Sequence, residues 1–284
     1  MVYQPPKWEK ELRNKAKVWK KQDGKISAYY NMMALLARNE RKESAQRDYR
    51  RIYSNLHLEY HMIAGNLYLK NPDDIQCVTY CYLSGLAGIF AYLFDHAVGE
   101  KISKQQQNLD ITEMEHAVKD FACSILQLYA VNQPIPPYMK HINHLYISLF
   151  EGDFEKTRSL LSKTGTEFDC SNPDQLWISE TERSIIQSIL CKDDNALYKS
   201  LVQHIKNYRK WPGGYSTFID IRSIAYIKLA RQYGMNCELN IIEIPNMFFD
   251  DTICRIDVTE MKLPFYEDAV EQLKTFGIEG ITLL

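Results

Sequence analysis

Apolar residues recur at steps of three and four along most of the chain, which is the spacing of one face of an α-helix. The longest such pattern covers residues 49–67, where it continues for about five turns. The same spacing predicts further helices over 112–129, 138–150, 154–161, 174–190, 195–208 and 221–230. Only short extended pieces are expected, near 238–244 and 252–257. We therefore predict an all-α fold, a multi-helix array of antiparallel helical hairpins that is partly solenoid-like.

Residues 77–94 contain no charged side chain, and this length is the lower limit for a helix that crosses a membrane. Polar residues such as Thr79 and Ser84 dilute the apolar run. Before it, Asn71 is a candidate N-cap and Pro72 a candidate first helical residue, which is typical of a soluble helix. We therefore predict a central helix buried on nearly all sides, and no membrane association.

Two stretches in the second half of the chain resemble each other. Residues 152–161 align with residues 193–202, and the alignment places Asp153 opposite Asp194. A period near forty residues predicts stacked helical hairpins. The alternative is that acidic residues occur at any such turn, because they stabilise helix N-termini. One domain is predicted for all 284 residues, with 99–110 as the place where a subdivision would fall.

The composition also predicts a cellular compartment. Hydrophobic residues make up 45% of the chain and charged residues 25%, which is ordinary for a globular protein. The seven cysteines are scattered and form no CxxC pair. The first residues, MVYQPPKWEKEL, lack the apolar core of a signal peptide. We therefore expect a cytoplasmic protein whose thiols are reduced and buried as small apolar groups.

Charge is distributed unevenly, although the net charge is only −2. Residues 1–60 hold fourteen Lys and Arg against seven Asp and Glu, a net charge of +7. Residues 241–284 hold three against nine, a net charge of −6. This asymmetry indicates a partner-binding surface or, alternatively, two chain ends that pack together. Trp8, Leu12 and Trp19 share one helical face among the N-terminal basic residues, which favours docking over nucleic acid binding.

The sequence contains no constellation that predicts catalysis. His57 and His61 share a helix face, but a zinc protease needs Glu directly after the first His, and Glu59 lies two positions on. Glu113 and His116 form one Glu-x-x-His unit, whereas a di-iron bundle needs two. Phosphate-binding glycine loops and nucleophile elbows are missing from the sequence. We therefore expect no enzyme activity, no metal and no cofactor.

The stretch 218–245, FIDIRSIAYIKLARQYGMNCELNIIEIP, predicts a helix that ends at Gly234, followed by an extended run that ends at Pro245. This stretch, together with the preceding LCKDDNALYKSLVQHIKNYRKW, resembles the C-terminal region of the immunity protein 49 family. The resemblance covers about residues 170–250. It implies an all-α cytoplasmic antidote that binds and blocks a bacterial polymorphic toxin, and it implies no catalytic motif.

The resemblance and the charge pattern together predict a cognate toxin protein, such as a nuclease, as the partner. Acidic residues near the C-terminus would then face the cationic surface of the toxin, with neighbouring aromatic residues as buried anchors. The candidate partner-binding residues are Asp250, Asp251, Asp257, Glu260, Glu267, Asp268, Phe248 and Phe249, with Phe265 and Tyr266 as further aromatic residues. The alternatives are a helical scaffold or regulator that binds another protein, and an enzyme that uses the histidines with a metal.

Overall fold

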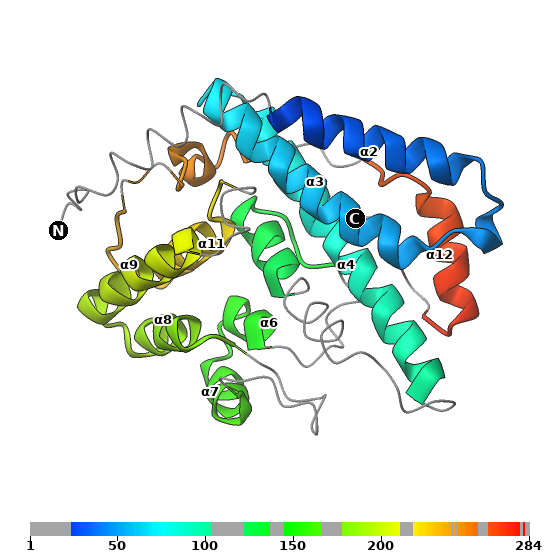
Figure 1. Cartoon of the computed structure of the whole chain (residues 1–284). Helices are drawn as coiled ribbons and strands as arrows, with labels where there is room; N and C mark the ends of the chain where they lie inside the picture. Colours follow the sequence, from blue (N-terminus) through cyan, green and yellow to red (C-terminus); the bar gives the residue numbers. More distant parts are fainter. Residues whose placement is uncertain are drawn as a thin grey trace.

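The computed structural model describes most of the chain, namely residues 24–103, 122–136, 145–165, 178–210, 218–239, 241, 243–254, 261–278 and 281. The regular structure in these ranges is helical, which confirms the predicted all-α class (Figure 1). The elements are α2 (Gly24–Glu40), η1 (Ser44–Gln46), α3 (Tyr49–Lys70), α4 (Gln76–Ser103), α6 (Leu145–Phe150), α7 (Phe154–Lys163), α8 (Glu180–Cys191), α9 (Asp194–Lys210), α11 (Ile221–Gln232), η3 (Asn246–Phe249) and α12 (Tyr266–Thr275). Residues 122–130 form one more helical stretch.

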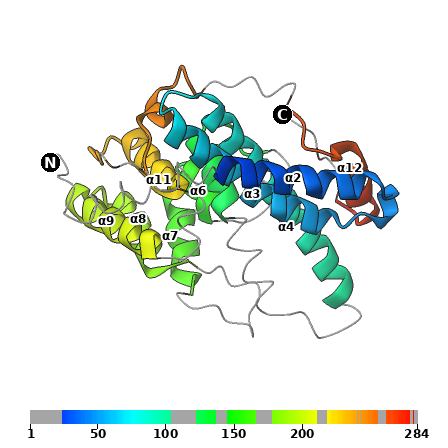
Figure 2. The same cartoon turned by 45° about the horizontal axis from the view of Figure 1, so that its top comes forward.

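Helices α3 and α4 lie side by side in both views of the ribbon (Figures 1 and 2). Aromatic rings meet across the pair at 5.1 to 5.9 Å between centroids, in the pairs Tyr49–Phe94, Tyr53–Phe90 and Tyr60–Tyr80. The residue number falls along α4 as it rises along α3, so the two helices run antiparallel. The helix predicted over 49–67 is confirmed.

Helix α4 contains a long apolar segment. Its segment Gln76–Phe94 has the length and composition of a membrane span, yet 78% of it is buried inside the protein. A core helix of a globular protein meets the same criterion, so the segment is weak evidence for a membrane. The predicted burial of residues 77–94 is confirmed.

Two glycines allow the helical stretch 122–130 to approach α4 closely. A Cβ atom on Gly88 would lie 1.9 Å from Ser124 Oγ and 2.8 Å from His57 Nδ1. A Cβ atom on Gly85 would lie 3.1 Å from Leu128 Cδ2. Real Cβ atoms do not approach neighbours to 1.9 Å, so Gly88 sets the distance between these helices.

The prediction that Asn71 caps α4 is wrong. Asn71 is instead the C-cap of α3, where its backbone N–H donates to Leu67 O. The next helix begins only at Gln76, whose backbone N–H donates to Asp74 Oδ1. Asp74, three residues after Asn71, therefore supplies the side-chain acceptor at the start of α4.

The predicted start of α8 near 174 is also wrong, because residues 178 and 179 are not helical. Ser179 is the N-cap and forms a capping box with Glu182, in which each side chain binds the backbone N–H of the other residue. The sequence SETE carries this signal, and it outweighs the apolar spacing that precedes it.

The two acidic turns of the predicted repeat both serve as caps. Asp153 Oδ1 accepts from Lys156 N at 3.0 Å before α7, and Asp193 Oδ1 accepts from Ala196 N at 2.9 Å before α9. The structurally equivalent residue is therefore Asp193 and not Asp194. Capping alone explains the acidic residues. The solenoid-like stacking stays a prediction.

Helix α11 has the predicted end. Tyr233 is its C-cap and Gly234 follows with φ of +79°, a left-handed conformation that favours glycine. The described residues of 238–244 form no regular structure. The expected extended piece at 252 is wrong, because Thr252 N and Oγ1 both donate to Asp250 Oδ1 and close a turn over 251–254.

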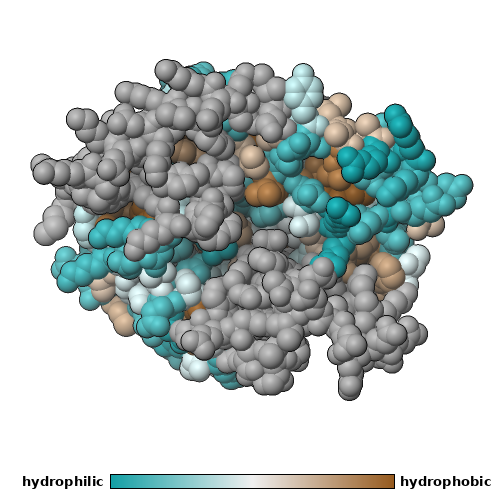
Figure 3. All heavy atoms as spheres, viewed as in Figure 1, coloured by the Kyte–Doolittle hydropathy of each residue, from teal (hydrophilic) through white to brown (hydrophobic). Residues whose placement is uncertain are grey.

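Helix α12 lies next to the pair of α3 and α4, on the side where α2 also lies (Figure 1). The Tyr53 hydroxyl donates to Pro264 O at 3.0 Å, and the ring of Tyr266 lies 5.4 Å from that of Phe90. Figure 3 shows apolar surface between the polar residues on the side of α2. Tyr30 is 67% exposed there and Met33 45%.

Several predicted features lie outside the described residues. They include the N-terminal basic segment with Trp8, Leu12 and Trp19, the Glu113–His116 unit, the start of the helix at 112, and residues 138–144 before α6.

Candidate functional site

The predicted acidic surface divides into two groups at different places in the fold. Asp250 and Asp251 follow η3, whereas Glu267 and Asp268 begin α12. The two groups lie on opposite sides of the molecule in both ribbon views (Figures 1 and 2). Asp257 and Glu260 lie outside the described residues. The four acids that can be placed therefore do not form one continuous surface, and their contact with a toxin stays a prediction.

The two aromatic residues before these acids, Phe248 and Phe249, also differ in exposure. Phe248 is completely buried, so the structure removes it from the candidate binding surface. Phe249 is partly exposed, and the guanidinium of Arg231 lies 4.4 Å from the centroid of its ring. Consecutive residues in a 3₁₀ turn point in different directions, which separates the two.

The acids of α12 have partners within the protein. Glu267 Oε1 accepts from Lys262 Nζ at 2.7 Å. Asp268 accepts from Arg47, whose guanidinium also lies 4.5 Å from the centroid of Phe265. The basic Arg47 and the acidic Asp268 thus join opposite ends of the described chain. For this pair, the alternative explanation of the charge asymmetry, that the chain ends pack together, holds.

Asp251 and Phe249 instead line a surface groove of about 720 Å³. Its other walls come from α6, from α11 and from the segment that follows the helical stretch 122–130. We call this feature the 129–251 groove, and its lining residues are Tyr129, Asn132, Gln133, Pro134, Ile135, Ile147, Phe150, Glu151, Lys228, Arg231, Gln232, Phe249 and Asp251.

Stacked aromatic rings form one wall of the 129–251 groove. Tyr129 and Phe150 lie 4.1 Å apart between centroids with an interplanar angle of 8°. The Tyr129 hydroxyl donates to Gln232 Oε1, which connects this wall to α11. An aromatic pair of this kind offers a large apolar area whose shape is already fixed.

Two cations of α11 lie in the groove, and both have internal partners. Lys228 Nζ donates to Ala130 O at 2.5 Å and to Asn132 Oδ1 at 2.7 Å. Burial lowers the pKa of Lys228, although Cys254 and Asp251 nearby act in the opposite direction. Arg231 Nε donates to Cys237 O at 3.3 Å.

The carboxylates of the groove are less engaged. Asp251 Oδ1 accepts from Asn132 Nδ2 at 2.9 Å. Glu151 is exposed, and its carboxylate makes no hydrogen bond or ion pair with any residue that the structure describes. The free hydrogen-bond acceptors of the groove are therefore carboxylates, whereas Lys228 already has three partners.

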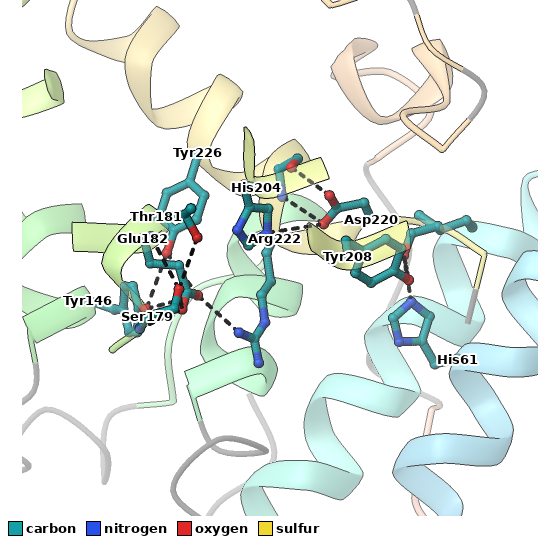
Figure 4. A network of polar contacts seen from close by, with 12 residues as sticks. His61, Tyr146, Ser179, Thr181, Glu182, His204, Tyr208, Asp220, Arg222 and Tyr226 are labelled. Atoms are coloured by element: carbon teal, nitrogen blue, oxygen red, sulfur yellow. Dashed lines mark hydrogen bonds and ion pairs between the residues drawn. The ribbon is translucent and has the colours of Figure 1, made fainter. Parts of the chain in front are cut away.

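Behind the groove, α6, α8 and α11 share a buried polar network centred on Glu182 (Figure 4). Arg222 Nη1 donates to Glu182 Oε1 at 3.0 Å, and Ser179 Oγ donates to Glu182 Oε2 at 2.7 Å. The hydroxyls of Tyr146 and Tyr226 lie 3.5 and 3.3 Å from Glu182 Oε1. Burial raises the pKa of Glu182, but Arg222, His204 and the hydrogen bonds from Ser179 together outweigh burial, and the pKa falls to about 2.

The start of α11 extends this network. Asp220 is fully buried, and its carboxylate accepts from Ser223 N at 3.1 Å and from Ser223 Oγ at 2.7 Å. His204 Nε2 lies 3.8 Å from Asp220 Oδ1, which is an ion pair only when the histidine is protonated. The network therefore fixes α11 at the end opposite to the groove residues Lys228 and Arg231.

The histidine pair on α3 is buried and hydrogen-bonded. His57 Nδ1 lies 2.9 Å from Ser84 O, and His61 Nε2 lies 3.1 Å from Ile219 O. Gln127 Nε2 lies 3.3 Å from His61 Nδ1. Burial lowers the pKa of His61 to about 3, so the ring is neutral. Among the described residues, no group of three or more His, Cys, Asp or Glu side chains is arranged to hold a metal ion.

The cysteines follow the prediction in part. Four of them are buried as expected, namely Cys77, Cys81, Cys237 and Cys254, whereas Cys191 is exposed. Burial raises the pKa of Cys237 to about 11. Cys123 is partly exposed; burial raises the pKa of its thiol, but Arg222 and His57 outweigh that effect and the pKa is lowered. This thiol is a feature that the sequence pattern did not predict.

Sequence reasoning missed the network, and of the groove it identified only Asp251 and Phe249. A charged residue in the apolar run IRSIAYIKLA, Arg222, was the available signal for a buried partner. The groove had no comparable signal, because its walls come from segments about 120 residues apart. Comparison with known proteins gave no matching family model, no matching curated protein and no matching solved structure.

Proposed function

We propose that this chain is an immunity protein that binds a cognate bacterial polymorphic toxin and neutralises it. The observation that carries the proposal is the 129–251 groove, in which stacked aromatic rings lie next to carboxylates with spare hydrogen-bonding capacity. Aromatic anchors surrounded by polar groups are typical of protein–protein interfaces.

The placement of the ionisable groups supports binding over catalysis. Glu182 and Arg222 form an ion pair inside the protein, where they bind each other and neighbouring hydroxyls. Neither residue lines the groove. A general acid or base has to reach its substrate, whereas a buried and satisfied pair of this kind positions helices.

A cationic toxin fits the available charge. A nuclease carries Lys and Arg to bind phosphates, and exposed carboxylates on an antidote increase the rate of association with such a surface. The free and buried cysteines Cys77, Cys81 and Cys237 support action in the reducing cytoplasm.

Co-expression with the protein encoded by the gene immediately upstream tests this function. The C-terminal domain of that protein is expressed in a bacterial host with and without this chain, and viable counts and co-purification are measured. We expect the domain to be toxic alone, and we expect this chain to restore growth and co-purify with it. Restored growth without a complex, or a complex without protection, would exclude the proposal. The second outcome would favour a helical scaffold.

A further inference from the structure

We infer that the 129–251 groove accepts an extended basic segment of the partner protein, in which Lys or Arg flanks an apolar side chain. This inference rests on the proposed function and assigns to it a place on the molecule. It follows from three properties of the groove, which are its free carboxylates, its apolar wall and its amide groups.

The cations of the groove are already engaged. The ammonium group of Lys228 is held by Ala130 O and Asn132 Oδ1, and its third contact is Cys254 Sγ at 3.8 Å. The guanidinium of Arg231 lies over Phe249, and its Nε binds Cys237 O. An anionic ligand would have to compete with these contacts, and it would also meet the nearby carboxylates.

Two carboxylates of the groove can still bind a cation. Glu151 has no side-chain partner among the described residues, and Asp251 uses one oxygen for Asn132. Asp250, next to Asp251, is exposed, and among the described residues its carboxylate accepts from the Thr252 side chain and the local backbone. These free carboxylate acceptors favour a Lys or Arg side chain, which forms a charge-assisted hydrogen bond with such a group.

An apolar side chain of the same segment fits between these charges. The Tyr129–Phe150 stack and the exposed part of Phe249 provide the surface, and Pro134 and Ile135 continue it. An extended segment exposes its backbone, and side-chain amides can both donate to and accept from peptide groups. Gln133 and Gln232 supply such amides inside the groove.

A selection from a random 12-residue peptide library tests the inference with the full chain as the target. We expect the selected peptides to be enriched in Lys and Arg next to an apolar residue. The double variant Glu151→Lys with Asp251→Lys should weaken their binding at least tenfold in fluorescence anisotropy. Higher salt should weaken binding to the wild type.

The matched control is Glu40→Lys with Glu271→Lys, which changes the net charge equally at exposed sites on α2 and α12. It should leave peptide binding within about twofold. Selection of acidic peptides, failure to select any peptide, or equal loss of binding in both double variants would overturn the inference.

The same two variants separate this inference from the proposed function. If the groove variant loses peptide binding but still neutralises the toxin, the groove is not the surface that meets the toxin, and the function stands. If neither the wild type nor the variants neutralise the toxin while peptide binding depends on the groove, the function fails and the chemistry of the groove stands.

Discussion

At the scale of single residues, the central feature is the buried contact between Glu182 and Arg222. Glu182 loses its hydration on burial and Arg222 loses most of its own, and the ion pair and the surrounding hydroxyls compensate for that loss. The pair is satisfied through Ser179, Tyr146 and Tyr226, so its effect on stability becomes visible when one member is removed.

Glu182→Gln should lower the free energy of unfolding by about 1–3 kcal/mol, because it removes the counter-charge of Arg222, whose side chain is only 26% exposed. Urea denaturation measures the change. Glu180→Gln is the matched control, since Glu180 is exposed in the same helical turn, and we expect no measurable effect. A Glu182→Gln protein as stable as the wild type would show that the pair contributes nothing.

The same residue predicts how stability depends on pH. The pKa of Glu182 is about 2 in the folded protein, below its ordinary value of 4.5. A lowered pKa means that the stabilisation is present above pH 4.5 and is lost as the pH falls toward 2. Over that window the wild type should lose more stability than Glu182→Gln does, as urea titrations at successive pH values would measure. Parallel curves for the two proteins would contradict the prediction.

Protonation of His61 affects stability at higher pH than protonation of Glu182 does. Its pKa is about 3 in the folded protein and 6.5 ordinarily, so protonation below pH 6.5 favours the unfolded chain. We expect a loss of about 1.4 kcal/mol per pH unit from this residue between pH 6 and 4.5. His61→Gln should flatten the pH dependence in that window. An NMR titration that shows His61 protonating near pH 6.5 in the folded protein would contradict this.

At the scale of elements, helix existence was easier to predict than helix boundaries. The pattern over 49–67 identified α3 because one apolar face faces the core for its whole length. The starts of α4 and α8 were missed because several capping residues compete locally, and tertiary packing selects one of them. The prediction did not include α12, whose burial depends on contacts with the distant Phe90 and Tyr53.

Gly88→Ala tests the contact between α4 and the helical stretch 122–130. Alanine is the better helix former by about 1 kcal/mol, yet we expect a net loss of about 1–3 kcal/mol because its Cβ would overlap Ser124 Oγ. Adding Ser124→Ala should recover part of the loss in thermal or urea denaturation. A stabilised Gly88→Ala protein would show that the two helices can move apart without strain.

At the scale of the whole molecule, residues that are close in the sequence do not all share one surface. Asp250 and Glu267 belong to the same acidic stretch, but Asp250 follows η3 and Glu267 lies in the first turn of α12. Asp251 and Phe249 do share a site, together with residues contributed from 129 to 135. Such a site depends on the arrangement of distant helices, which local periodicity does not determine.

The contact between Arg47 and Asp268 joins the first and last described helical regions. Asp268→Ala should lower the free energy of unfolding by about 1 kcal/mol, because Arg47 is mostly buried and loses its partner. Glu267→Ala, beside it and highly exposed, is the control and should have no measurable effect. Urea denaturation of both variants checks this, and equal effects would show that Asp268 has no special role.

The two ends of helix α11 have different roles. Arg222, Ser223 and Tyr226 hold it in the core, while Lys228 and Arg231 lie in the groove beside Glu151. Substitutions at Glu151, Gln133 or Asp251 touch none of the buried network, so they can accumulate with little penalty in folding. Descendants of such a protein can therefore change the partner they recognise in a few mutational steps, while selection for the fold keeps the interior unchanged.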